Sequence, residues 1–168
     1  GDLYSCLADQ GYLERLLTDG REILFVSNVD NLGAVLDLRI LHYMLSEDIP
    51  FLMEVTPKTA VDTKGGALYQ EKGRIKLLEV ANVPPEHIAE FCGQQKFKMF
   101  NTNNIWINLV RLKELLEKGP LDLDVIVNRK MVKGQPVLQL ETAAGTAFNC
   151  FPEAVGLVVP RERFFAVK

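Results

Sequence analysis

Residues 21–34 read REILFVSNVDNLGA, and this stretch decides the fold class. Its apolar run from Ile23 to Val26 is typical of a parallel strand that is buried on both faces. The run ends at a polar stretch, SNVDN (residues 27–31), and Gly33 then permits a tight turn. Apolar residues recur at helical spacing from Leu32 to Leu45, so we expect a helix there. Strand, polar loop and helix in this order indicate an α/β domain.

The polar loop after this strand is a candidate ligand site, because ligands of open α/β sheets bind at the carboxyl ends of strands. Asp30 is placed where a carboxylate could hold a divalent cation against a phosphate group. A second interpretation stays open at this point: Asn28 to Asn31 could simply cap the helix that follows.

Length and composition restrict the class of protein. The chain has 168 residues, 48% of them hydrophobic, which suits one domain or a large part of one. Its net charge of −3 provides no broad basic surface for nucleic acid. We find no apolar run long enough for a transmembrane helix, and we expect no secretory leader. Three widely spaced cysteines without CxxC spacing predict free thiols, and we expect a cytoplasmic protein.

The rest of the chain predicts further helices and strands around this unit. A second strand at Phe51–Val55 would complete a βαβ unit with the first. A β-hairpin is expected between Ala67 and Ala81, and a second pair of strands is joined by a turn at 133–134. The other predicted helices are 3–17, with a break near Gly11, 86–92, 110–118 and 143–148, and the other predicted strands are 125–127, 137–140, 157–159 and 164–167.

Two features near the predicted hairpin could belong to a site. The adjacent glycines of Lys64-Gly65-Gly66 allow backbone N–H groups to approach a ligand closely, although a flexible turn would also explain them. Glu79 stands among apolar residues, where a carboxylate usually has a partner or a function. The alternative for Glu79 is an edge-strand position that faces water.

The sequence NTNN at residues 101–104 is the third polar candidate. Asparagine side chains both donate and accept hydrogen bonds, which suits sugar hydroxyl groups, and these are expected to follow a strand. The alternative is an asparagine-rich cap to the helix that begins near Leu109. Spacing and composition alone therefore predict an α/β domain with a polar site at several strand ends.

Five stretches carry a family resemblance in their order along the chain: FVSNVDNLGAVLDL, MEVTPKTAVDTKGG, KFKMFNTNNIWINL, VLQLETAAGTA and VPRERFFAVK. Together they resemble the eukaryotic-type UDP-glucose pyrophosphorylase family, also called UTP–glucose-1-phosphate uridylyltransferase. The resemblance implies a Rossmann-like nucleotidyltransferase domain, a three-layer α/β/α structure with a mixed sheet, followed by a β-helix domain. Residues 1–168 would be an incomplete part of that single catalytic domain, without its upstream glycine-rich nucleotide loop and without the downstream β-helix.

The same resemblance implies an enzyme that makes UDP-glucose and pyrophosphate from UTP and glucose 1-phosphate, with Mg²⁺ as cofactor. Two alternatives remain: a pyrophosphorylase for UDP-N-acetylhexosamine or for several UDP-sugars, and a catalytically silent relative that binds UDP-sugars. No nucleic-acid or membrane partner is expected, and a homo-oligomer would form through the C-terminal β-helix domain. We expect residues 1–168 to be inactive by themselves.

The resemblance also implies roles for individual residues. Asn28 and Asp30 would contact substrate, with Asp30 as the magnesium ligand, and Asn103 would contact glucose. Lys168 would contact the phosphate groups, so that Asp30 and Lys168 are the implied catalytic residues. By analogy with sugar nucleotidyltransferases in general, the remaining substrate contacts would come from the backbone of Gly65 and Gly66 and from Glu79, which would bind sugar hydroxyls.

Overall fold

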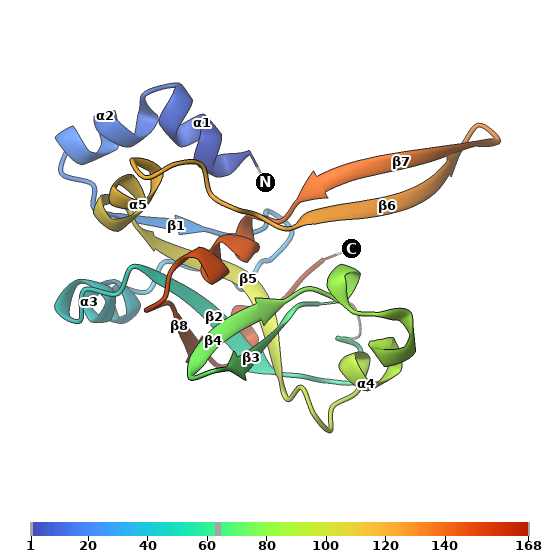
Figure 1. The fold of residues 1–168 in the computed structure, drawn as a ribbon. Helices are drawn as coiled ribbons and strands as arrows, with labels where there is room; N and C mark the ends of the chain where they lie inside the picture. Colours follow the sequence, from blue (N-terminus) through green and yellow to red (C-terminus); the bar gives the residue numbers. More distant parts are fainter. Residues whose placement is uncertain (1, 63–64, 168) are drawn as a thin grey trace.

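The computed structural model describes residues 2–62 and 65–167, which form an α/β structure around a mixed sheet (Figure 1). The four strands of this sheet within the described residues are, in spatial order, β1 (Ile23–Val26), β5 (Met99–Asn108), β2 (Phe51–Pro57) and β8 (Val155–Val158). Strand β5 runs antiparallel to both β1 and β2, whereas β8 runs parallel to β2.

The two strands predicted first, β1 and β2, are confirmed as strands, but they are not neighbours in the sheet. Strand β1 is only partly buried and pairs antiparallel with β5, so the expectation of a parallel strand buried on both faces at Ile23–Val26 is wrong. Strands β1 and β2 run parallel to one another because each is antiparallel to β5, and β5 lies between them. Ile105 of β5 pairs with Val26 on one side and with Met53 on the other. The predicted βαβ unit is therefore present, with α3 between two parallel strands, but β5 separates these strands in the sheet. Strand β5 can occupy the centre because its residues Ile105, Trp106 and Ile107 are apolar and buried.

The helix predicted at the start of the chain is confirmed as two helices, α1 (Leu3–Asp9) and α2 (Tyr12–Thr18). Gly11 separates them with a φ of +69°, a left-handed conformation that glycine adopts without strain. Helix α5 (Leu109–Leu116) is also confirmed, and Asn108 caps it, because the Asn108 side-chain oxygen accepts hydrogen bonds from backbone N–H groups of the first turn.

Helix α3 (Leu38–Ser46) begins later than its predicted start at Leu32. Asp37 caps this helix, because its side chain accepts a 2.9 Å hydrogen bond from the backbone N–H of Arg39. The preceding residues bond to a distant segment instead, as when the Leu32 N–H donates to the carbonyl oxygen of Phe165 at 2.9 Å. Tertiary hydrogen bonds thus replace the first helical turns that the apolar spacing predicted.

Side chains of the sheet alternate between two cores, so that helices cover both faces. Met53 and Ile107 point into the core that includes residues of α1, α2 and α5. Leu52 and Trp106 point to the opposite face, where they pack with residues of α3. The predicted three-layer α/β/α arrangement is confirmed, and Figure 1 shows α3 apart from α1, α2 and α5.

The first predicted hairpin is confirmed as β3 (Ala67–Glu71) and β4 (Arg74–Leu78). Its two-residue turn has positive φ angles at Lys72 and Gly73, of +50° and +81°. Positive φ at both central residues is typical of a type I′ turn, whose twist matches that of the flanking strands.

The second hairpin is also confirmed and is longer than predicted, with β6 (Val125–Val132) and β7 (Gln135–Thr142). Its turn is at Lys133 and Gly134, whose φ angles are +50° and +79°. This hairpin projects away from the rest of the structure (Figure 1).

Short helices complete the described chain: η1 (Val80–Asn82), η2 (Pro85–His87), α4 (Ile88–Cys92), η3 (Ala144–Cys150) and η4 (Arg161–Arg163), where η denotes a 3₁₀ helix. The predicted strand at 164–167 is wrong, since this segment makes an isolated bridge between Asn31 and Ala166 instead. The three cysteines are free, as predicted. None of the helices in the described part of the chain has the length and apolar content needed to cross a membrane.

Candidate functional site

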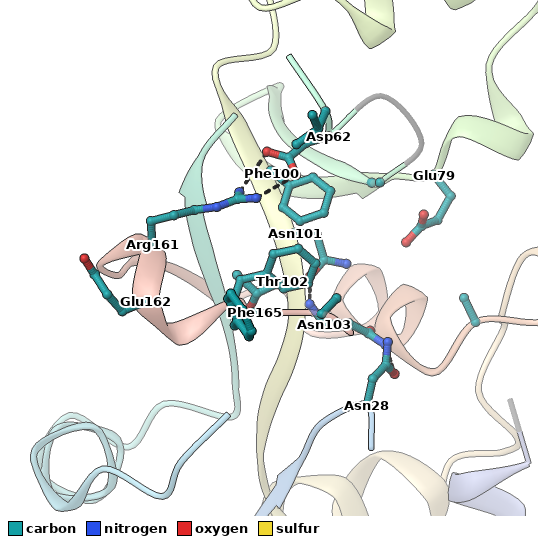
Figure 2. A pocket seen from close by; sticks show the side chains of 16 residues that line it. Asn28, Asp62, Glu79, Phe100, Asn101, Thr102, Asn103, Arg161, Glu162 and Phe165 are labelled. Carbon is teal, nitrogen blue, oxygen red and sulfur yellow. Dashed lines mark hydrogen bonds and ion pairs between the residues drawn. The ribbon is translucent and has the colours of Figure 1, made fainter. Parts of the chain in front are cut away.

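A pocket of about 910 Å³ opens at the edge of the sheet where β1, β2 and β8 end (Figure 2). Residues 100–103 of β5 line it together with segments that follow the other three strands. Five of the predicted site residues, from four separate stretches of sequence, line this one pocket: Asn28, Gly65, Gly66, Glu79 and Asn103. The predicted residues therefore gather in one pocket at this edge of the sheet.

Asn103 lies inside strand β5 and not after a strand, in contrast to the prediction. Its φ of +59° interrupts the regular ladder, and the pairing of β5 with β2 shifts register between Met53 and Val55. Its side-chain Nδ2 donates a 2.7 Å hydrogen bond to Oδ1 of Asn28. Because the cap of α5 is Asn108, the helix-cap interpretation of the NTNN stretch is wrong.

Gly65 and Gly66 are each in close contact with a neighbouring side chain that leaves no room for a Cβ atom. A Cβ on Gly65 would lie 1.9 Å from a ring carbon of Phe100, and a Cβ on Gly66 would lie 2.8 Å from the Glu79 carboxyl. The carbonyl oxygen of Gly66 also accepts a 2.9 Å hydrogen bond from the backbone N–H of Asn101. The flexible-turn interpretation therefore does not hold for these two residues.

Glu79 is half-buried and its carboxyl group faces the pocket (Figure 2). Burial raises the pKa of this carboxyl group, and a hydrogen bond from the Asn101 side chain only partly offsets the increase. The alternative of an edge-strand glutamate that faces water is therefore wrong. A half-buried carboxylate with free lone pairs can accept hydrogen bonds from hydroxyl groups of a ligand.

Asp30 lies beside the pocket without lining it. Its backbone oxygen accepts a 2.9 Å hydrogen bond from the N–H of Val167, which joins the SNVDN loop to the C-terminal segment. Helix α3 begins after Asp37, so the interpretation of Asn28–Asn31 as its cap is wrong. Two other predicted positions, Lys64 and Lys168, lie outside the described residues.

The side chain of Asp30 forms no hydrogen bond or ion pair with the residues that the structure describes. Nor do three or more histidine, cysteine, aspartate or glutamate side chains gather in residues 2–62 and 65–167 as a complete metal cage. A single carboxylate with an open coordination sphere matches a cation such as Mg²⁺, which commonly takes its other ligands from substrate phosphates and water.

The structure adds an ion pair to the site that sequence reasoning missed. The guanidinium of Arg161 donates to both carboxylate oxygens of Asp62, at 2.8 and 2.9 Å. Burial alone would raise the pKa of Asp62, but hydrogen bonds from Arg161 and Thr59 outweigh it and lower that pKa. The same guanidinium lies over the rings of Phe100 and Phe164. The signal in the sequence was the run RERFF, where two arginines precede two aromatic residues.

A mixed α/β/α sheet with a polar pocket at its carboxyl edge defines the class of Rossmann-like ligand-binding domains. Comparison with known proteins then identifies the family within this class. The chain belongs to the UTP–glucose-1-phosphate uridylyltransferase family, whose model matches residues 1–168.

Individual relatives agree with this family. UTP–glucose-1-phosphate uridylyltransferases from Pyrus pyrifolia and Encephalitozoon cuniculi are each 51% identical to the chain over its whole length. A crystal structure of a UDP-glucose phosphorylase from Trypanosoma brucei superposes over 99% of the chain with a TM-score of 0.92 and 45% identity. A mutant UDP-glucose pyrophosphorylase from Leishmania major, solved in complex with UDP-glucose, gives a TM-score of 0.90 and 41% identity, again over 99% of the chain.

The chain spans about a third of the length of these relatives. It covers 36% and 34% of the two curated proteins, and 38% and 39% of the chains in the two solved structures.

Proposed function

We propose that the full-length protein containing these residues is a UTP–glucose-1-phosphate uridylyltransferase, which forms UDP-glucose and pyrophosphate from UTP and glucose 1-phosphate. The observation that carries this proposal is the convergence of four distant stretches on one pocket, in a chain of this family. The named activity of relatives at about half identity supports it, as does the UDP-glucose bound in a similar solved structure.

The proposed reaction matches the kinds of residue in the pocket. A phosphate oxygen of glucose 1-phosphate attacks the α-phosphorus of UTP, a new P–O bond forms, and the bond to the β-phosphate oxygen breaks as pyrophosphate leaves. The substrate itself supplies the nucleophile, so a serine or cysteine nucleophile is not required. Catalysis then depends on positioning the two substrates and on neutralising their charge.

Side chains of the pocket can bind the sugar. Asn103 offers both an amide donor and a carbonyl acceptor, and Glu79 offers a carboxylate acceptor. Because Gly65 and Gly66 have no side chain, the Phe100 ring and the Glu79 carboxyl pack directly against their backbone at the pocket wall. We propose that these residues bind the glucose hydroxyl groups and the adjoining part of the nucleotide.

Two polyanionic substrates can meet only if cations offset their charge. We propose that Asp30 holds Mg²⁺ through its open carboxylate, with the remaining ligands from phosphate and water. Mg²⁺ bound there would neutralise phosphate charge during the transfer. Lys168 is joined directly to Val167, whose N–H is bonded to the Asp30 carbonyl, and we propose that its ammonium group contacts the phosphates.

A cytoplasmic location is the remaining part of the proposal. Three free cysteines, one of them exposed, suit a compartment that keeps thiols reduced. Fractionation of cells that produce the full-length protein would test this, with recovery in a secreted or vesicular fraction as the contrary result.

The direct test is pyrophosphate-dependent release of UTP by the full-length protein with Mg²⁺. UDP-glucose, UDP-galactose and UDP-N-acetylglucosamine would be compared as substrates at equal concentration. We expect a strong preference for UDP-glucose. Comparable release from several sugars would instead identify a broad UDP-sugar pyrophosphorylase, and no release by a folded protein would indicate a silent UDP-sugar-binding relative.

A further inference from the structure

A carboxylate is completely buried behind the pocket, in the middle of strand β2. Glu54 is 0% exposed, and both of its oxygens accept hydrogen bonds. The guanidinium of Arg163 donates to both oxygens, at 2.6 and 2.5 Å. The indole N–H of Trp106 adds a bond of 2.8 Å, and the side-chain Nδ2 of Asn104 adds one of 3.1 Å. This charge is therefore paired and fully hydrogen-bonded, as burial requires.

The carboxylate determines how two asparagine amides are oriented. A carboxylate can only accept hydrogen bonds, so the NH₂ end of Asn104 must face Glu54 and its oxygen must face away. That oxygen accepts a 3.0 Å bond from Nδ2 of Asn31. The Asn31 oxygen is thereby directed at two backbone N–H groups, those of Gly33 at 3.1 Å and Phe165 at 2.8 Å.

Arg163 reinforces this arrangement with its backbone and its side chain. Its carbonyl oxygen accepts bonds from Nδ2 of Asn31 at 3.1 Å and from Nδ2 of Asn104 at 3.2 Å. Its guanidinium reaches beyond Glu54 to the carbonyl oxygen of Val35, at 2.8 Å. The Glu54–Arg163 ion pair and its hydrogen bonds thus connect three parts of the chain: the SNVDN loop, strand β5 and the C-terminal segment.

This cluster adjoins the proposed site without forming its wall. Glu54, Arg163 and Asn104 do not line the pocket. However, Asn31 follows Asp30 directly, and Asn104 follows Asn103. Each of the two amides therefore belongs to the residue next to a proposed site residue.

We propose that Glu54 and Arg163 are positioning residues for uridylyl transfer. They orient the amides of Asn104 and Asn31, and these amides hold the SNVDN loop against β5 and the C-terminal segment. The inference rests on the function proposed above, because it concerns the placement of Asp30 and its neighbours relative to the substrate phosphates. Misplacement by about 1 Å can lower a rate by about a hundredfold.

The test separates positioning from stability by replacing both partners of the ion pair. Removal of one partner leaves the other charge buried without a partner, whereas replacement of a whole buried pair by apolar residues often preserves stability. The double variant Glu54→Met/Arg163→Met would be made in the full-length protein. Leu13→Ala, which removes a buried side chain from α2 in the opposite core, is the control for a loss of stability alone.

We expect the double variant to remain folded while kcat for UTP release from UDP-glucose falls at least tenfold and KM changes less than threefold. The Leu13→Ala control should lower the unfolding temperature and keep kcat within twofold of wild type. A double variant with wild-type kcat would overturn the proposal. If the double variant does not fold, Arg163→Lys, which keeps the charge but loses the two-pronged geometry, takes its place with the same expected kcat loss.

A second readout does not depend on catalysis and distinguishes failure of this inference from failure of the proposed function. The backbone N–H groups of Gly33 and Phe165 are bonded to Asn31, so their hydrogen exchange should accelerate at least tenfold in the double variant. The Leu13→Ala control should not show this local acceleration. If the wild-type protein released no UTP, unchanged exchange at these two amides would still overturn the positioning role.

Discussion

The side-chain amide of Asn103 donates a 2.7 Å hydrogen bond to Oδ1 of Asn28, and this bond joins the central strand to the SNVDN loop. Asn103 has a φ of +59°, a conformation that asparagine and glycine tolerate better than other residues. The residue that interrupts the strand therefore also lines the pocket and bonds to the SNVDN loop.

Two substitutions at Asn103 would separate its backbone from its side chain. Glycine adopts the positive φ at position 103 without strain, whereas alanine there adds about 1 kcal/mol of strain. We therefore expect Asn103→Ala to be less stable than Asn103→Gly by about that amount. Both variants lose the amide and should bind UDP-glucose about tenfold more weakly. Denaturant unfolding and calorimetric titration would measure these effects. Wild-type affinity in Asn103→Gly would contradict a binding role.

Glu79→Gln should stabilise the protein at neutral pH while it weakens ligand binding. Because burial raises the folded-state pKa of Glu79, the wild type loses stability as pH rises from the ordinary pKa through the raised one. Glutamine does not titrate, so the stability advantage of the variant should grow across that window and be small at lower pH. Unfolding free energies measured across pH would test this, and a difference between variant and wild type that stays constant with pH would contradict it.

UDP-glucose affinity of Glu79→Gln should fall about tenfold or more, since hydrogen bonds to a charged acceptor are lost.

Asp62→Asn should destabilise the protein by about 1–2 kcal/mol at pH 7, because it removes the anionic partner of Arg161. The pKa of Asp62 is lowered in the folded state, so its contribution is present above the ordinary aspartate pKa and is lost as pH falls through the lowered one. The difference between variant and wild type should therefore narrow in acid. Glu71→Gln, which breaks the exposed pair with Lys76, is the control and should change stability by at most about 0.5 kcal/mol. Equal losses of stability in the two variants would show that burial of the Asp62–Arg161 pair adds nothing to its contribution.

Gly65→Ala should destabilise the protein by about 1–3 kcal/mol, because the new methyl group overlaps the Phe100 ring. The ring has little room to move, since it packs against Phe164 with centroids 4.9 Å apart. Gly93→Ala is a matched control, where the nearest atom to the new Cβ is 3.3 Å away. Thermal unfolding would compare the two, and a Gly65→Ala variant as stable as the control would exclude the overlap.

Asp30→Asn should lower turnover at least tenfold while the fold survives, because the amide is a poorer magnesium ligand than the carboxylate. Asp19→Asn makes the same chemical change in an exposed turn and should leave turnover unaltered. Turnover would be measured over a range of magnesium concentrations. Near-normal turnover of Asp30→Asn at saturating magnesium would exclude the proposed metal role.

Local pattern predicted most helices and strands but not the order of strands. The apolar run at Ile23–Val26 and the turn at Lys133-Gly134 are short-range signals, and the structure has a strand and a turn at these places. No short-range signal reports that β5 separates β1 from β2, because that arrangement depends on pairings between distant residues such as Val26 and Ile105.

The candidate site was predictable where an unusual residue stood in unusual company. Glu79 was predicted because a carboxylate among apolar residues usually has a partner or a function. The same rule applied to FLMEVT (residues 51–56) would have predicted Glu54, which is more deeply buried. Arg161 and Arg163 were harder to assign, because their partners, Asp62 and Glu54, are distant in sequence.

The central position of β5 has a consequence for synthesis on the ribosome. Strands β1 and β2 emerge long before β5, which supplies the hydrogen bonds for an edge of each. At about 5–20 residues per second, translation from residue 23 to residue 108 takes on the order of several seconds, during which apolar strand edges stay open to incorrect pairing. We expect nascent chains to gain protease resistance only after residue 108 has left the exit tunnel. Chains arrested before and after that point would reveal the step, and the interval before it is when chaperones would have most to protect.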